Sequence, residues 1–280
     1  MFRAIVVSLS LLVPFVPSAG FAQAATGESA AVRLQDALRL SDVLAIMREE
    51  GTQSGQELRQ EMFPATSGRR WDATLARVYD DASMQHMLDA ALADAALPDD
   101  AAQEALEFFS SELGQRVVRL ELEARHRLLD DAQEDLARLA ASDLQQSDPD
   151  RFALLQELVT ANDLVEMNIS GAMNSSLAFY RGMISGGAFP DGIAEGEILD
   201  DVWSQEPAIR ADTETWVYPY LVTAYSDLSD ADLRSYVQFS QSGAGQAMNQ
   251  WLFESYDQVF ARISEILGRE TARHMAGQDI

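Results

Sequence analysis

The sequence predicts an all-α protein built from two tandem, diverged helical units. After residue 32, nearly every segment repeats its apolar residues with the 3.6-residue period of a helix, and none shows the sustained alternation of a strand. The pattern Phe-x-x-Ser-x-x-Gly-Gln occurs at residues 108–115 and again at residues 239–246, an offset of 131 positions. We therefore expect a first unit over residues 32–142 and a second over residues 150–270, each with a helix-corner-helix motif.

The first 24 residues have the features of a secretory signal peptide. Arg3 provides a positive charge, residues 4–16 form an apolar run of 13 residues, and Ala22-Gln23-Ala24 has the small-x-small pattern that signal peptidase cleaves. The run is shorter than the roughly 20 residues of a membrane-spanning helix, and no later stretch is apolar enough to span. These features predict a periplasmic protein whose mature chain has no integral membrane segment.

Composition excludes several classes of function. Forty-five acidic residues against 20 basic ones give a formal net charge of -25, and such a surface repels nucleic-acid phosphates and anionic membranes. The 20 basic residues are all Arg, and the absence of Lys excludes a P-loop, a Schiff-base lysine and a Ser-x-x-Lys hydrolase. The absence of Cys excludes disulfides, so stability depends on packing.

Apolar stripes indicate where individual helices lie. In the first unit, one apolar stripe begins at Trp71, and its residues move to another face of the helix before the stripe reaches Ala95. The polar residues 143–150, which include a Pro, form the predicted joint between the units. In the second unit, residues 184–197 contain several Gly and a Pro and are predicted to form an inserted surface loop. The last stripe is predicted to end with its helix at Gly268, because Gly adopts the left-handed conformation that ends many helices.

The repeated motif predicts a sharp corner between two helices. Asp99 in the first copy and Ser229 in the second are predicted to cap the helix that enters the corner. The motif serine is predicted to cap the helix that leaves it. The motif glycine then lies in the first turn of that helix, where Gly costs up to about 1 kcal/mol, so a steric need such as close helix approach is expected. The repeated residues, with the Phe rings expected to fill the corners, are Phe108, Ser111, Gly114 and Gln115 and then Phe239, Ser242, Gly245 and Gln246.

In these residues the chain resembles the domain of unknown function 2059, a helical domain of exported bacterial proteins in which Phe-Tyr-x-Ser-Pro-x-Gly-Gln is typical. The resemblance covers a short stretch of each unit, under a third of the chain. Glu112 and Gly243 stand where that family usually has Pro, which makes each corner less rigid. The resemblance implies a small helical fold in the periplasm, and it brings no established activity or catalytic residue.

No constellation of catalytic or metal-binding residues is predicted. Glu123 and His126 have the spacing of a metal-binding pair, but the helical wheel places both away from the apolar stripe. His86 and His274 stand alone, without the partners that a metalloprotease or hydrolase motif requires. The acidic residues 189–201 lack the ligand order of an EF-hand. The sequence therefore predicts no metal and no cofactor, and it indicates a protein that is not an enzyme.

Aromatic residues of the second unit give the candidate binding site. Trp216, Tyr218 and Tyr220 cannot all lie on one face of a helix, and Pro219 among them removes a backbone donor and is predicted to interrupt the helix. Some of these rings are therefore expected to border a groove. Its candidate residues are Tyr180, Trp203, Trp216 and Tyr220.

These observations indicate a non-enzymatic binding or interaction role in the periplasm, with an unidentified protein or a small apolar ligand as partner. A carrier of a small apolar ligand in a groove of the second unit is the alternative, and a hydrolase has the least support. A deep apolar pocket would favour the carrier, whereas a shallow exposed patch would favour contact with a protein.

Overall fold

The computed structural model describes residues 29–63 and 68–277, so the predicted signal peptide lies outside the described residues. The described residues form helices and no strand, which confirms the all-α fold class. The helices of the N-terminal half are α1 (Ala30–Ala37), α2 (Leu40–Met62), α3 (Gly68–Val78), α4 (Asp81–Asp94), α5 (Asp99–Phe109), α6 (Glu112–Arg127) and α7 (Asp131–Ser147). Those of the C-terminal half are α8 (Pro149–Ala161), α9 (Leu164–Ser185), α10 (Glu195–Ser204), α11 (Glu206–Tyr225), α12 (Asp230–Gln241) and α13 (Gly243–Met275). None of these helices has the length and apolarity needed to cross a membrane.

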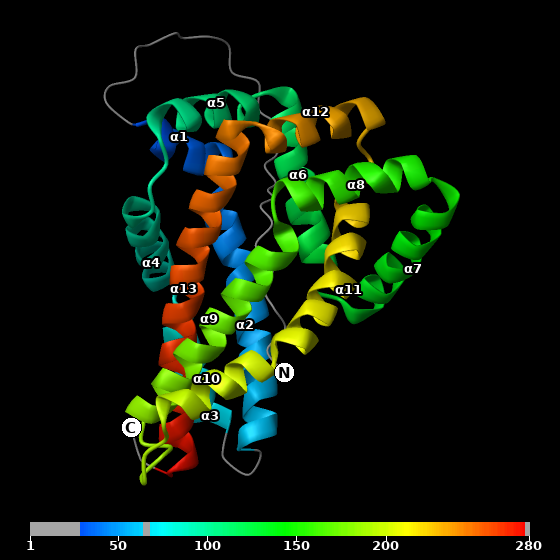
Figure 1. Cartoon of the computed structure of the whole chain (residues 1–280). Coiled ribbons are helices and arrows are strands. Elements are labelled where there is room, and N and C mark those ends of the chain that lie inside the picture. The colour runs from blue at the N-terminus through cyan, green and yellow to red at the C-terminus, as the bar shows by residue number, and fades with distance from the viewer. Residues whose placement is uncertain (1–28, 64–67, 278–280) are drawn as a thin grey trace.

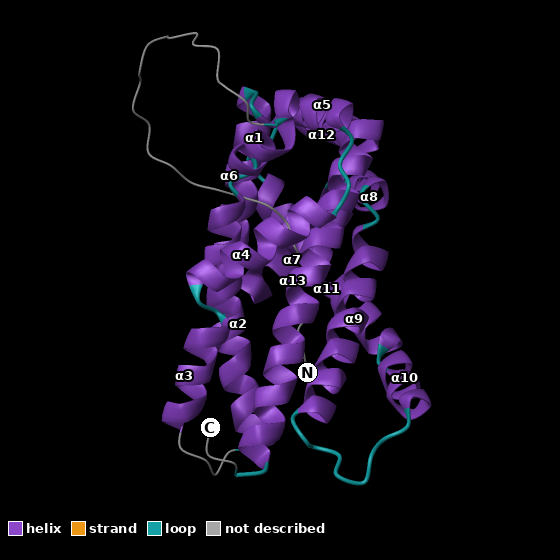
Figure 2. Cartoon of the chain, turned by 90° about the vertical axis from the view of Figure 1, so that its left-hand side faces the viewer, coloured by secondary structure: helices purple, strands orange, loops and turns teal. Residues whose placement is uncertain are grey.

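The longest helix, α13, is the axis of the molecule. It packs against α9 and also against α3, α4 and α5 of the N-terminal half, while α11 packs in turn against α6 and α7. Helices α1, α5 and α12 lie together at one end of the molecule, and α3 and α10 lie at the other (Figure 1, Figure 2). Because helices of each half pack on helices of the other, one hydrophobic core runs through both halves.

Two tryptophans fill this core. Trp251 of α13 is 1% exposed, and its indole N–H donates to the carbonyl oxygen of Leu92 on α4 at 3.1 Å. Trp71 of α3 is fully buried, and its indole N–H donates to the carbonyl oxygen of Gly55 on α2 at 2.7 Å. Both rings are therefore buried without leaving a donor unpaired, which is the condition under which a buried Trp stabilises a core.

Both predicted corners are present. The Ser111 hydroxyl oxygen accepts a hydrogen bond from the Gly114 N–H at 3.0 Å, and the Ser242 hydroxyl oxygen accepts one from the Gly245 N–H at 3.1 Å. Each serine thus caps the helix that leaves its corner. A Cβ added to either glycine would lie within 3 Å of the carbonyl oxygen of the motif phenylalanine. Glycine is required because the second helix begins directly against the last turn of the first.

The two corners also contact each other. The rings of Phe108 and Phe239 stack with their centroids 4.1 Å apart and their planes 10° from parallel. Gln115 donates from Nε2 to the carbonyl oxygen of Ala37 at 2.9 Å, which ties the first corner to α1. Its counterpart Gln246 lines a cavity in the C-terminal half instead. The repeated residues therefore fill equivalent positions but do not all have equivalent partners.

The predicted caps and boundaries before α5 and α12 are correct in part. Ser229 caps α12 as predicted, by accepting a hydrogen bond from the Asp232 N–H at 3.1 Å. The prediction for Asp99 is wrong, because Asp99 is the first residue of α5 and the N-cap position is Pro98, which has no side-chain acceptor. The apolar stripe that begins at Trp71 changes direction because it belongs to two helices. The chain turns between α3 and α4, and Asp80 caps α4.

Three further predicted boundaries are also corrected. The last helix does not end at Gly268, because α13 continues to Met275. An added Cβ at Gly268 would lie within 3 Å of the carbonyl oxygen of Phe179 on α9, so this glycine serves a close helix contact. The predicted loop at residues 184–197 is shorter, since α9 extends to Ser185 and α10 begins at Glu195. The predicted joint at residues 143–150 is also shorter, because α7 extends to Ser147 and α8 begins at Pro149, so only Asp148 lies between the two helices.

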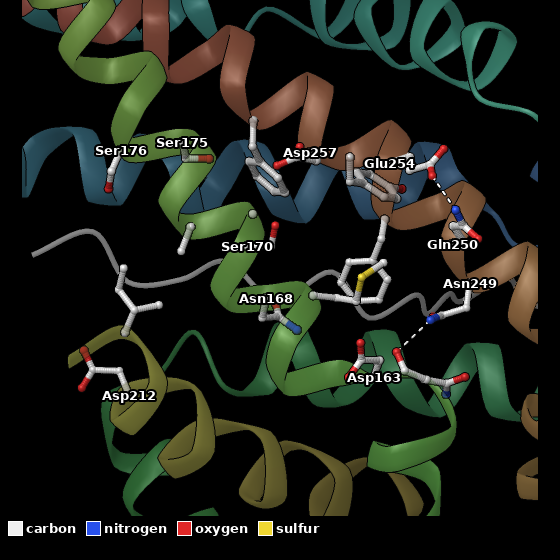
Figure 3. A pocket seen from close by; sticks show the side chains of 18 of the residues that line it. Asp163, Asn168, Ser170, Ser175, Ser176, Asp212, Asn249, Gln250, Glu254 and Asp257 are labelled. Atoms are coloured by element: carbon white, nitrogen blue, oxygen red, sulfur yellow. Dashed lines mark hydrogen bonds between the residues drawn. The ribbon is translucent and has the colours of Figure 1, made fainter. Parts of the chain in front are cut away.

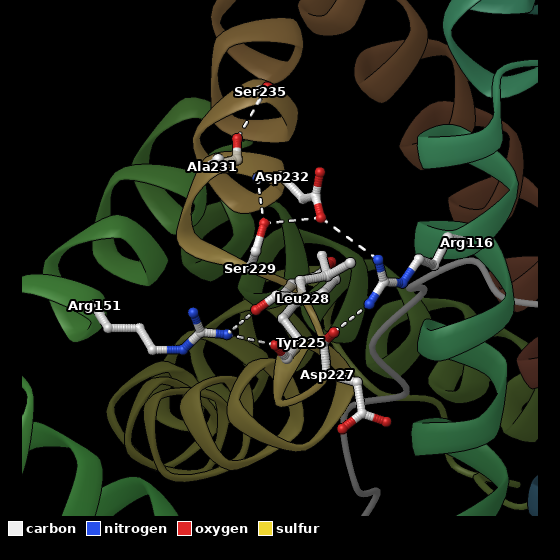
Figure 4. A network of polar contacts seen from close by, with 9 residues as sticks. All are labelled: Arg116, Arg151, Tyr225, Asp227, Leu228, Ser229, Ala231, Asp232 and Ser235. Carbon is white, nitrogen blue, oxygen red and sulfur yellow. Dashed lines mark hydrogen bonds and ion pairs between the residues drawn. The ribbon is translucent and has the colours of Figure 1, made fainter.

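Two arginines hold the connection between α11 and α12 from opposite sides (Figure 4). Arg151 of α8 donates from Nη2 to the carbonyl oxygens of Tyr225 and Leu228, at 2.6 and 2.8 Å. Arg116 of α6 donates to the carbonyl oxygen of Asp227. These guanidinium groups satisfy carbonyl groups that the end of a helix leaves without a helical partner.

Replacing Gly245 with Ala is expected to lower the free energy of unfolding by about 1 to 3 kcal/mol, because the added methyl group overlaps the carbonyl oxygen of Phe239. Gly114→Ala is expected to behave in the same way. The matched control is Gly243→Ala, two positions earlier in α13, where an added Cβ meets nothing within 4 Å. That control is expected to be neutral or to stabilise by up to about 1 kcal/mol. Urea unfolding measures the three values, and equal stabilities of Gly243→Ala and Gly245→Ala would refute the steric account.

Candidate functional site

A cavity of about 800 Å³ lies in the C-terminal half, between the N-terminal parts of α9 and α13 and the start of α11. Cavities that hold small organic molecules typically have volumes of about 300 to 1,000 Å³. Figure 3 shows how polar side chains from the three helices surround it; those labelled include Asp163, Asn168 and Ser170 at α9, Asp212 on α11, and Asn249, Gln250, Glu254 and Asp257 on α13.

The cavity begins where the close contact between α9 and α13 ends. Toward their C-terminal ends these two helices touch backbone to backbone, at Gly182, Gly186 and Gly268. A Cβ added to any of the three would lie within 3 Å of atoms of the other helix. No residue but Gly fits such positions, so the sequence fixes where the two helix axes come closest.

Toward the N-terminal ends, side chains instead of backbone make the contacts of α13. Asn174 of α9 donates from Nδ2 to Asp257 Oδ2 on α13 at 3.0 Å, and Asn249 of α13 donates from Nδ2 to the carbonyl oxygen of Asn162, the residue that ends α8 just before α9, at 2.8 Å. The spacing is wide enough that a Cβ added to Gly171, between these two contacts, would meet a single atom within 4 Å, Asp257 Oδ1 at 3.6 Å. The wider spacing produces the cavity.

The wall of the cavity has both apolar and polar parts. Its large apolar side chains are Met167, Ile209, Phe253 and Phe260. Its amide and hydroxyl side chains include Asn162, Asn168, Ser170, Ser175, Ser176, Gln205, Gln246, Asn249 and Gln250. A wall of this kind suits a molecule that has an apolar body and several hydrogen-bonding groups.

All charged side chains that line the cavity are acidic. Among the described residues no Arg or His lines it, and the four carboxylates are those of Asp163, Asp212, Glu254 and Asp257. Arg210 follows Ile209 on α11, but its guanidinium is already engaged by Glu166, with Nη2 2.8 Å from Oε2, and by Glu206, with Nε 2.8 Å from Oε1. The cavity therefore has a negative electrostatic potential that no neighbouring cation of its wall offsets.

Two buried polar atoms at the wall have no hydrogen-bond partner in the described part of the chain. Asp257 is partly buried; Oδ2 accepts from Asn174, whereas Oδ1 is buried and unpaired. Burial raises the pKa of Asp257, and the hydrogen bond from Asn174 lowers it. Tyr256 is 1% exposed, its hydroxyl is buried and unpaired, and burial raises its pKa. Each unpaired buried atom costs about 1 to 3 kcal/mol.

The four aromatic residues predicted to border a groove do not line this cavity. The hydroxyl of Tyr180 donates to the carboxylate of Asp201 on α10. Trp203, also on α10, is 64% exposed to solvent. Trp216 is half-buried and stacks on Tyr220, with ring centroids 4.8 Å apart.

Tyr220 belongs to the core, contrary to the prediction. It is 1% exposed, and its hydroxyl donates to the carbonyl oxygen of Glu121 on α6 at 3.3 Å. The physical reason is that Pro219 does not interrupt its helix: α11 runs continuously from Glu206 to Tyr225 with Pro219 inside it. The aromatic residues therefore keep helical directions, and those that face α6 become buried.

A buried polar cluster on α6 escaped the sequence analysis. The Glu121 carboxylate is 4% exposed and accepts hydrogen bonds from the hydroxyls of Tyr225 and Tyr236, the second at 3.2 Å. Arg125, one turn later and 2% exposed, binds Glu50 through Nε and Nη2 at 2.8 and 2.6 Å. A signal was present, since both positions are flanked by the apolar stripe of their helix. Charged residues in such a stripe indicate buried pairing.

The structure brings together no metal-binding cluster among the described residues, and His274 lies among aromatic rings. In the described part of the chain, no three His, Asp or Glu side chains are placed together to hold a metal ion. His274 stacks on Phe63, with ring centroids 5.6 Å apart, and meets Trp71 edge-on at 5.3 Å. Burial lowers the pKa of His274, which favours its neutral form among these rings.

Comparisons of the chain with family models, curated proteins and solved structures give no match. The resemblance to the domain of unknown function 2059 therefore stays a prediction that rests on the repeated motif. Any statement about function has to come from the chemistry of the site.

The Glu121 cluster is expected to make stability fall as the pH rises. Burial raises the pKa of Glu121 to about 8 from its ordinary value of 4.5, although the hydroxyls of Tyr225 and Tyr236 oppose the shift. The folded protein therefore holds this proton more tightly than the unfolded chain, so the stabilisation is complete below pH 4.5 and is lost up to about pH 8. Glu121→Gln cannot ionise and is expected to give a flatter curve of unfolding free energy against pH, with the higher stability at about pH 8. Chemical unfolding across this range measures both curves, and identical slopes would contradict the account.

Proposed function

We propose that this protein is an exported, non-enzymatic binding protein that holds a small organic molecule in the cavity between α9 and α13. The single observation that carries the proposal is the cavity itself. It has about 800 Å³ of volume, and large apolar side chains, many amides and hydroxyls, and four carboxylates line its wall. This combination is what a site for a small ligand requires, because apolar contact provides affinity and a few polar groups fix orientation.

The signal-peptide pattern of residues 1–24 supports a periplasmic location for this binding protein. A wall rich in amides and carboxylates supports a ligand that is not purely apolar, which refines the carrier considered from the sequence. The same wall holds no Ser, His and Asp arrangement of a hydrolase, since no His lines it among the described residues. Binding without chemistry is therefore the function that we favour.

We also infer that helices α1–α6 and α8–α13 are diverged copies of one unit, with α7 as the connection. Each set has six helices, and its last two form a Ser-capped corner. The turn before the second helix of each set contains a residue with positive φ, Arg39 at 50° and Asp163 at 48°. The fourth helix of each set also packs against the last helix of the other set: α4 packs against α13, and α11 packs against α6. Under this inference the cavity is a specialisation of the second copy.

Contact with another protein is a second candidate, supported by α10. Trp203 is 64% exposed and Leu199, one turn before it on the same helix, is 38% exposed. An exposed Trp is common in protein interfaces because its large ring buries much apolar surface on contact. This surface is separate from the cavity, so the two candidates can be tested independently.

Filling the cavity with Gly171→Leu tests the proposed function. An added Cβ at this position meets only Asp257 Oδ1, at 3.6 Å, so a Leu side chain has room to enter the cavity. Leu also has a higher helix propensity than Gly, by up to about 1 kcal/mol, so the variant is expected to melt at or above the native temperature. In a fluorescence titration with the neutral apolar dye N-phenyl-1-naphthylamine, we expect the native protein to bind and the variant to bind at least about 10-fold more weakly.

The matched control is Gly196→Leu on α10, where an added Cβ meets nothing within 4 Å and the residue does not line the cavity. It is expected to bind the dye as the native protein does. Trp203→Ala reports on the second candidate and is also expected to leave dye binding unchanged. If Gly171→Leu is stable and binds the dye as tightly as the native protein does, the cavity is not a ligand site.

A further inference from the structure

The charges around the cavity restrict the ligand that it can take. Three of its four carboxylates, those of Asp163, Asp212 and Glu254, are exposed, and Asp257 is the one that is partly buried. The chain as a whole carries a formal net charge of -25. Exposed carboxylates around an entrance attract a cation over about a Debye length and repel an anion, so they favour entry of a positively charged molecule.

Asp257 is placed to bind the charged group of such a molecule. Asp257 lines the cavity and keeps part of its surface accessible. Oδ2 accepts from Asn174, and Oδ1 has no hydrogen-bond partner among the described residues. A carboxylate with so few protein donors gains most from a donor that is itself charged, because such hydrogen bonds are about twice as strong as neutral ones.

The neighbours of Asp257 on α13 supply the contacts for the rest of the molecule. Phe253 lies four positions before Asp257 and Phe260 three positions after it, spacings that put all three on one face of a helix. Both Phe residues line the cavity. A carboxylate between two aromatic rings suits an ammonium group, which is attracted by the carboxylate charge and by the ring faces.

We propose that the ligand is an organic cation, a primary or secondary amine on an aromatic or aliphatic body, whose ammonium group binds Asp257 between Phe253 and Phe260. This inference rests on the proposed function of the cavity and specifies the class of ligand for that same site. Met167 and Ile209 then contact the apolar body, and the amides of the wall bind its further polar groups.

A pair of probes that differ only in charge tests the proposal. Tryptamine and indole-3-ethanol have the same ring and chain length, and they end in an ammonium group and a hydroxyl group respectively. Isothermal titration calorimetry of the full mature protein is expected to show tryptamine binding about 10- to 100-fold more tightly than indole-3-ethanol, which is the usual difference between a charged and a neutral hydrogen bond at a buried acceptor.

Asp257→Asn keeps the shape of the side chain and removes its charge. It is expected to abolish the preference for tryptamine while the protein melts at or above the native temperature, because a partly buried charge has been removed. Asp200→Asn on α10 is the matched control: it removes an exposed carboxylate that does not line the cavity, and it is expected to keep the preference within about 2-fold.

The outcomes separate the two proposals. If tryptamine and indole-3-ethanol bind the native protein equally and Asp257→Asn changes neither affinity, the amine proposal is overturned and the binding function stands. If N-phenyl-1-naphthylamine and both indole probes fail to bind the native protein, both proposals are overturned. Selective tryptamine binding that depends on Asp257 and not on Asp200 supports the inference.

Discussion

Backbone contact between α9 and α13 is the constraint on which the rest of the structure depends. At Gly182, Gly186 and Gly268 no side chain separates the two helices, so their C-terminal parts have one relative position. That contact helps to hold the 33-residue α13 in the centre of the molecule, where it also packs against α3, α4 and α5. Toward the other end Asn174 of α9 binds Asp257 of α13 through its side chain, and a Cβ added to Gly171 would meet only Asp257 Oδ1, at 3.6 Å, so the helices are further apart. The cavity forms because α9 and α13 touch through their backbones at one end and only through side chains at the other.

The two halves depend on each other for their cores. The buried carboxylate of Glu121 on α6 has its hydrogen-bond donors, Tyr225 and Tyr236, on helices of the C-terminal half. The indole of Trp251 in that half has its acceptor, Leu92, in the N-terminal half. Neither half could bury these groups alone without leaving polar atoms unpaired. The shared core is therefore a requirement of the chemistry, and it leaves the cavity on a rigid scaffold.

Local signals in the sequence predict the helices and the two corners, because the Ser-x-x-Gly geometry involves residues only three positions apart. The cavity could not be predicted in this way, since it depends on how two helices distant in sequence approach each other. Gly268 shows the limit: a glycine near a helix end and a glycine at a helix contact look alike in sequence. Pro219 shows another, because tertiary packing keeps α11 continuous through it. Asp257 was visible as an acidic residue of the last helix, but nothing local marks one of its oxygens as unpaired.

A crystal structure of the protein with bound tryptamine tests the central claim most directly. The account predicts that the amine nitrogen lies within hydrogen-bond distance of the Asp257 carboxylate, about 2.7 to 3.0 Å, with the indole ring against Phe253 and Phe260. It also predicts that Gly182 and Gly268 keep their contacts, because the scaffold is fixed before the ligand arrives. Tryptamine bound elsewhere, or α9 and α13 in close contact along their whole length with no cavity between them, would contradict it.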